Sequence, residues 1–174
     1  YNNGTSGSVY AGHWRTYTAN QTYTYSIFAK KAEVTSITIP IYAAAGWGSD
    51  GSVMFNLNTG TASISGTGIS SYSIAPLPNG WYRCSITATF GPTDTYGQYP
   101  VTGLTTNPMD SVSGVYLWGA QLEQGAFPTS FIPTTTASVT RAADSLTFPT
   151  GAWYNPTEGA LAIHGAVPYA GASV

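Results

Sequence analysis

Hydrophobic and polar residues alternate with a period of two along most of this chain, and no stretch repeats apolar residues at helical spacing for three turns. The segment "QTYTYSIFAKKAE" shows the alternation clearly, with large apolar side chains on one face and hydroxyls on the other. The two faces are Tyr23, Tyr25, Ile27 and Ala29 against Thr22, Thr24 and Ser26. This pattern predicts a half-buried β-strand.

Three more segments continue the pattern. The residues predicted to point into a core are Ile37, Ile39 and Ile41, then Val53, Phe55 and Leu57, then Tyr82, Cys84, Ile86 and Ala88. A turn signal, Pro78-Asn79-Gly80, precedes the last group, and Gly60 suits a hairpin loop after Leu57. We interpret Cys84 as a small buried hydrophobe rather than as a nucleophile.

Residues 115–122 predict a strand with apolar residues on both faces, which is typical of a central position. Strict alternation puts Trp118 on the same face as Leu122, so we assign Trp118 to packing, and Trp81 likewise. Arg83 would then stack on Trp81 or pair with a carboxylate such as Glu123. Residues 91–113 hold too many Pro and Gly for a central strand and predict a long loop.

The pattern predicts an all-β protein, an antiparallel β-sandwich of the jelly-roll type. Prolines and threonines without alternation follow residue 126, as in an extended connector. We therefore expect a sandwich over residues 1–135, a linker over 136–143, and a partial second β domain over 144–174, or strands that complete an assembly. The sequence begins with Tyr1 rather than Met, so we expect it to be an excised or processed piece of a longer protein.

Composition excludes several classes of function. Charged residues make up 7% of the 174 residues and the net charge is −2, which argues against nucleic-acid binding because phosphates require clustered cations. A single cysteine excludes an internal disulfide. No apolar run approaches the roughly 18 residues of a membrane span, so no membrane insertion is expected.

Catalytic signatures are absent from the sequence. The acidic residues are scattered, and the two that share the long loop, Asp94 and Asp110, suit turn formation. His13 and His164 lie far apart with no acid or cysteine at ligand spacing. The sequence holds no dedicated calcium loop. We expect neither an enzyme, nor a metal, nor a cofactor.

Five motifs, in order along the chain, carry a resemblance to a known family. They are "YTYSIFAKKAE", "VMFNLNTGTA", "LPNGWYRCSIT", "VYLWGAQLEQGAFPTSFIPTT" and "VTRAAD". Over roughly residues 9 to 144 the chain resembles a β-sandwich module of phage tail-fibre, head-fibre and other virion proteins, which is similar to jelly-roll carbohydrate-binding modules. The segment "FPTGAWYNPTEGALAIHGAV" is similar to the opening strands of a concanavalin A-like or laminin-G-like domain.

The resemblance implies a non-catalytic module on the surface of a virion, outside the cell. Its partners would be a cell-surface or environmental polysaccharide, other virion proteins and further copies of the chain, as in a trimer. Two alternatives stay open: a purely structural virion protein that makes oligomer and capsid contacts, and an accessory module of a polysaccharide-degrading enzyme. Compared with the family, we expect the first strand of the module to be missing before Tyr1 and the second domain to stop almost where it begins, through truncation or because the piece assembles with other chains.

A glycan site needs exposed aromatic rings with a few polar partners. Tyr42 and Trp47 flank one predicted loop, and Tyr96 and Tyr99 lie in the predicted loop 91–113. Asp94 and Gln98 in the same loop are the predicted polar partners. The candidate ligand-binding residues are Tyr42, Trp47, Asp94, Tyr96, Gln98 and Tyr99. The same rings could instead cover the ends of the sandwich or pack against a neighbouring subunit.

Overall fold

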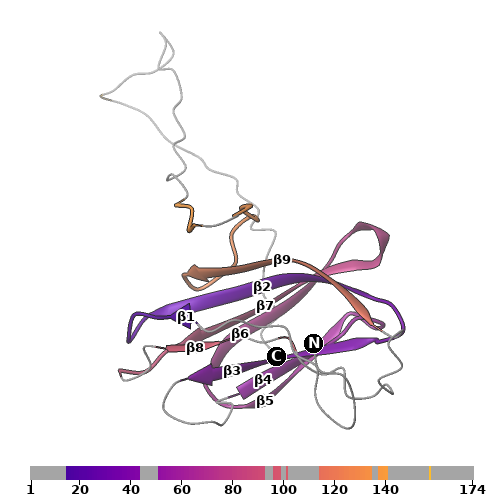
Figure 1. The fold of residues 1–174 in the computed structure, drawn as a ribbon, viewed down its shortest axis with the longest axis horizontal. Helices are drawn as coiled ribbons and strands as arrows, with labels where there is room; N and C mark the ends of the chain where they lie inside the picture. Colours follow the sequence, from indigo (N-terminus) through magenta and orange to yellow (C-terminus); the bar gives the residue numbers. More distant parts are fainter. Residues whose placement is uncertain are drawn as a thin grey trace. The chain divides into compact units, whose positions relative to one another are not determined.

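The computed structural model describes residues 15–43, 51–92, 96–98, 101, 114–134, 137–140 and 157. At residues 43 and 96–98 it describes the backbone alone. The described strands form two antiparallel sheets that pack face to face (Figure 1). This confirms the predicted all-β antiparallel sandwich.

The two sheets have five and four strands. The five-stranded sheet has the order β1 (Arg15–Thr16), β8 (Tyr96–Gln98), β3 (Ser36–Ala43), β4 (Gly51–Asn56) and β5 (Thr61–Gly66). The four-stranded sheet has the order β6 (Ile69–Pro76), β7 (Trp81–Thr89), β2 (Thr22–Lys31) and β9 (Val115–Gln124).

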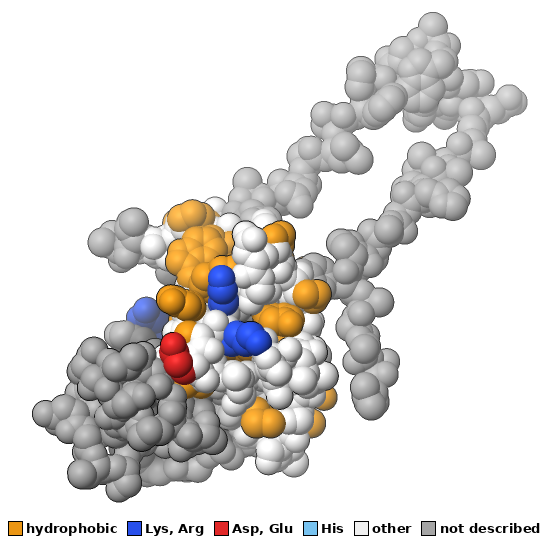
Figure 2. All heavy atoms as spheres, turned by 90° about the vertical axis from the view of Figure 1, so that its right-hand side faces the viewer, with side chains coloured by type: hydrophobic (Ala, Val, Ile, Leu, Met, Phe, Trp, Pro, Cys, Tyr) orange, Lys and Arg blue, Asp and Glu red, His pale blue; other side chains and the backbone are white. Residues whose placement is uncertain are grey.

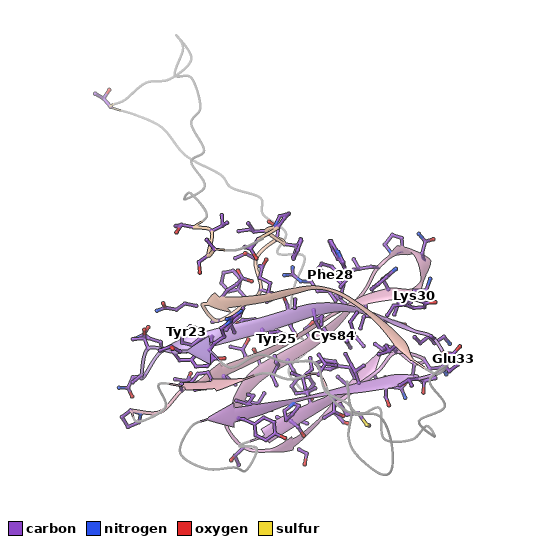
Figure 3. The ribbon with its side chains drawn as sticks, viewed as in Figure 1. Tyr23, Tyr25, Phe28, Lys30, Glu33 and Cys84 are labelled. Carbon is purple, nitrogen blue, oxygen red and sulfur yellow. The ribbon has the colours of Figure 1, made fainter. Side chains whose placement is uncertain are left out.

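The core between the sheets is built from the residues that the alternation predicts. Ile37, Ile39, Val53, Phe55, Cys84 and Ile86 are all fully buried. Tyr25 and Cys84 point from the four-stranded sheet toward the other layer, whereas Phe28 lies on the opposite side of β2 (Figure 3). Burial of these apolar side chains is the main stabilising contribution to such a sandwich.

The predicted turns form where the sequence places them. Gly60 has φ +70° between β4 and β5, and Asn79 and Gly80 have φ +61° and +75° in a short 3-10 turn, Pro78–Gly80. Glycine and asparagine adopt this left-handed region at the lowest steric cost. The described part of the chain contains no helix that is long and apolar enough to cross a membrane.

Three expectations about strand positions are wrong. The predicted loop 91–113 contains the short strand β8, which lies between β1 and β3. β2 is not half-buried, because the hydroxyl face opposite its core face is also covered: Thr24 and Ser26 are 0% and 1% exposed. β9 is not central but lies at the end of the sheet order beside β2.

The described contacts divide the chain into two units, residues 1–131 and 132–174. The first unit contains every strand described above. The second is described only at residues 132–134, 137–140 and 157, where no strand is assigned. A linker over 136–143 and a second β domain from residue 144 stay predictions.

Two buried groups of the core, the Cys84 thiol and the Tyr25 phenol, make the stability of the fold depend on pH in the alkaline range. Burial raises the pKa of the Cys84 thiol from 9.0 to about 12 and that of the Tyr25 phenol from 10.0 to about 12. The unfolded chain therefore loses these protons at lower pH than the folded one. The free energy of unfolding is expected to fall as pH rises from about 9 to about 12.

Denaturant titrations between pH 8 and 11.5 measure this effect. Cys84→Ala is the matched variant, because it removes the thiol and leaves the phenol, so the fall in stability near pH 9 should be smaller in it. Constant stability of the wild-type protein from pH 8 to 11 would contradict the assignment of Cys84 and Tyr25 to the closed core.

Candidate functional site

Three of the six predicted glycan-binding residues, Trp47, Asp94 and Tyr99, lie outside the described residues. Tyr42, predicted to be exposed, is half-buried at the end of β3, and its backbone partner across the sheet is Gln98 of β8. Tyr96 pairs with Thr16 of β1. The strand register thus brings Tyr42 and Gln98 together, and the other contacts of this predicted site stay predictions.

A second aromatic surface lies on the outer face of the four-stranded sheet, the face turned away from the core. Cross-strand partners in a sheet share a face, so residues of β7, β2 and β9 line up in rows. The rows are Trp81–Lys30–Tyr116, Arg83–Phe28–Trp118, Ser85–Ser26–Gln121 and Thr87–Thr24–Glu123. The first two rows are aromatic and basic, and the last two are polar.

Three aromatic side chains form a cluster on this face, which we call the ring platform: Phe28, Trp118 and Phe131. The Trp118 ring centroid lies 5.1 Å from that of Phe28 and 4.7 Å from that of Phe131. The Phe28 and Phe131 rings meet edge to face at 6.1 Å. Trp118 is nevertheless 57% exposed. The other two rings hold it in place while part of its surface stays open to solvent.

The expectation that Trp118 shares a face with Leu122 is therefore wrong, and a β-bulge is the reason. Ser26 pairs with Gln121 and Phe28 with Trp118, so Gly119 and Ala120 together oppose Ile27. Gly119 has φ +61°, as the first residue of such a bulge often does. The extra residue reverses the alternation, so Leu122 packs against the core while Trp118 faces outward.

Gly119 also leaves room for the ring platform. A Cβ atom at this position would lie 2.8 Å from Cδ2 of Phe28 and 3.3 Å from Cε2 of Phe131. Both distances are shorter than ordinary van der Waals contact between carbon atoms. The glycine is thus required both by its backbone conformation and by the rings beside it.

Arg83 extends the ring platform toward β7. Its guanidinium carbon lies 5.5 Å from the centroid of the Phe28 ring, a cation–π distance, and its Nη2 donates a 2.9 Å hydrogen bond to Oγ of Ser26. Arg83 therefore stacks on Phe28, not on Trp81 or against Glu123. On the face of the molecule that Figure 2 presents, basic side chains lie among hydrophobic ones, with an acidic side chain nearby.

The polar rows of the outer face are covered by the chain that follows β9, Gly125–Phe131, which we call the covering segment. Thr24 Oγ1 donates to the Gly125 carbonyl at 2.8 Å and shares a hydrogen bond with Thr87 Oγ1 at 2.8 Å. Gln121 donates to the Ser130 carbonyl at 3.4 Å. This covering explains the burial of the hydroxyl face, and it delivers Phe131 to the ring platform.

Glu123 fixes the covering segment. Its carboxylate accepts the Thr129 backbone N–H, with oxygens at 3.0 and 3.2 Å, and also the Thr129 hydroxyl. Hydrogen bonds to a charged acceptor are stronger than neutral ones. Glu123 is thus occupied by its own chain rather than by Arg83. The described residues contain no group of three or more His, Cys, Asp or Glu side chains that could hold a metal ion.

Replacing Glu123 by alanine is expected to loosen the covering segment and lower the free energy of unfolding by about 1–3 kcal/mol, because the Thr129 N–H loses a charged acceptor. Denaturant titration measures the stability, and hydrogen exchange of residues 125–131 measures the loosening. Glu123→Gln keeps one acceptor oxygen and should show a smaller effect. Unchanged exchange at Thr129 in the alanine variant would contradict this role.

Sequence reasoning missed Phe28 and Phe131 as site residues. A signal for Phe28 was present, since it falls on the face that otherwise carries Thr22, Thr24 and Ser26. A large ring on a polar strand face indicates either a covered face or a binding surface. Phe131 gave no such signal, because it lies in a segment without alternation.

The chain was also compared with known proteins. Neither the protein-family models nor the curated proteins gave a match.

Proposed function

We propose that this chain is a non-catalytic module that binds glycans on a host or environmental surface, and that it does so while displayed on a virion. One observation carries the proposal: Trp118 is 57% exposed, and its ring packs against the rings of Phe28 and Phe131 on the outer face of the four-stranded sheet. Aromatic faces cover the C–H surfaces of sugar rings, and a rigid platform lowers the entropic cost of binding. The virion setting rests on the sequence resemblance.

The described carboxylates support binding without chemistry. Glycoside hydrolysis uses a pair of carboxyl groups about 5–10 Å apart across the scissile bond. Glu123 is held by Thr129, and the Glu33 carboxylate accepts the Gly114 backbone N–H at 3.1 Å. Each of these side chains is therefore occupied in fixing a connection of the fold.

A structural virion protein is the second candidate function. Tyr116 and Phe127 are 59% and 70% exposed, and together with Trp118 they could be covered by a neighbouring subunit. Exposed apolar patches mark protein contacts as well as ligand sites. The sequence resemblance to jelly-roll carbohydrate-binding modules favours the glycan.

A glycan array with the purified protein tests the proposal. We expect a restricted set of glycans to bind, with no change in their length after long incubation. Tyr42→Ala should keep this binding, because Tyr42 lies on the other sheet. Absence of binding to every glycan, with Trp118→Ala changing the oligomeric state in sedimentation, would reject the glycan function and favour the structural one.

A further inference from the structure

Two basic side chains lie on the outer face next to the open rings. Lys30 stands between Trp81 and Tyr116 in one row, and Arg83 flanks Phe28 and Trp118 in the next. Adjacent rows on one face are about 7 Å apart along a strand, a distance that one disaccharide spans. Both cations are thus within reach of a ligand that lies on the rings.

These two cations have no carboxylate partner within the part of the chain that the structure describes. The acidic side chains described there are Glu33, bonded to the Gly114 N–H, and Glu123, bonded to Thr129. Arg83 is half-buried and bonds only to the neutral Ser26 hydroxyl, and its buried Nε has no hydrogen-bond partner among the described atoms. A partly desolvated cation without an anion favours the approach of one.

The neighbouring lysine provides a contrast. Lys31 follows Lys30 in β2, so its side chain points to the opposite side of the strand, where its Nζ donates to Oδ1 of Asn58. No hydrogen bond or ion pair of Lys30 is found among the described residues. Of the two adjacent lysines, Lys30, which lies in the aromatic rows, is the one whose side chain has no partner among the described residues.

We infer that the ligand of this face is an anionic glycan, whose carboxylate or sulfate groups bind Lys30 and Arg83 while its sugar rings stack on Trp118 and Tyr116. This inference rests on the proposed glycan-binding function and adds the chemical class of the ligand. Charge complementarity supports it: among the described residues, Lys30 and Arg83 have no ion-pair partner, and the carboxylate in the rows of this face, Glu123, is bonded to Thr129.

The test compares oligosaccharides that differ only in charge. Calorimetry of the full chain with hexagalacturonate should give binding that weakens as NaCl rises from 20 to 300 mM, because salt screens exposed charges. The fully methyl-esterified hexasaccharide should bind about three- to tenfold more weakly and without this salt dependence. Dextran sulfate against dextran provides the same comparison for sulfate, and the tighter of the two acidic ligands identifies the anion.

Two lysine variants sharpen the test. Lys30→Gln should weaken binding of the acidic hexasaccharide about three- to tenfold and leave binding of the ester unchanged. Lys31→Gln is the matched control and should change the affinity for neither the acidic hexasaccharide nor its ester. Equal affinity for the acid and its ester would overturn the inference while the glycan function stands. If neither the acidic hexasaccharide nor its ester binds, and no glycan on the array binds, the proposed glycan-binding function is rejected.

Discussion

Replacing Trp118 by alanine is expected to weaken glycan binding about thirtyfold, which corresponds to about 2 kcal/mol of binding free energy. The ring is the exposed member of the ring platform and offers the open face on which a sugar would stack. Its loss also leaves Phe28 and Phe131 without their common neighbour. Calorimetry with the tightest-binding glycan from the array measures the change.

The stability of the Trp118→Ala variant should stay close to that of the wild type, because Trp118 is already 57% exposed. Its thermal midpoint is therefore the control that separates loss of binding from loss of fold. Tyr42→Ala tests the predicted site on the other sheet in the same assay. Unchanged affinity in Trp118→Ala with a large loss in Tyr42→Ala would move the site to β3 and β8.

Replacing Gly119 by alanine is expected to lower the free energy of unfolding by about 2–3 kcal/mol and to weaken glycan binding as well. The left-handed backbone costs about 1–2 kcal/mol for a residue with a Cβ atom. The new Cβ would also meet Phe28 at 2.8 Å, so the Phe28 ring must shift under Trp118. Denaturant titration and calorimetry measure the two effects.

Gly80→Ala is the matched control for this prediction. Gly80 has a similar φ of +75°, but a Cβ there meets nothing within 4 Å. The control should therefore show the backbone cost alone and keep full binding. If both variants lose the same stability and both keep full binding, the arrangement of the ring platform does not depend on the β-bulge at Gly119.

The core of this sandwich could be predicted from the sequence because strict alternation holds in its strands. Ile37, Ile39, Val53 and Phe55 are all 0% exposed, as the period of two predicts. The turn at Asn79 and Gly80 was predictable for a local reason, since few residues adopt positive φ at low cost. Both features depend only on residues close in the chain.

The outer face could not be predicted in the same way. One extra residue at Gly119 reverses which side chains face the core, and a bulge leaves little trace in the alternation of β9. The burial of Thr24 and Ser26 depends on the covering segment, which is distant in sequence from β2. Contacts of this kind follow from tertiary packing rather than from local pattern.

The candidate site was missed for the same reason. Alternation placed Trp118 on the face of Leu122, so Arg83 was matched with Trp81 or Glu123, and Phe28 was not connected with Trp118. The cation–π pair of Arg83 and Phe28 joins β7 to β2, two strands far apart in the sequence. The predicted loop residues Trp47, Asp94 and Tyr99 lie outside the described residues, so that part of the prediction stays open to test.

The most direct measurement is an NMR titration of the isotopically labelled protein with hexagalacturonate, because it reports which side chains a ligand contacts and whether the ligand is cut. We predict that the Trp118 indole N–H, the Arg83 guanidinium and the Lys30 backbone amide shift together, while the hexasaccharide keeps its length. Shifts confined to Tyr42 and Gln98 on the other sheet, or cleavage of the saccharide, would contradict the account of a non-catalytic ring platform.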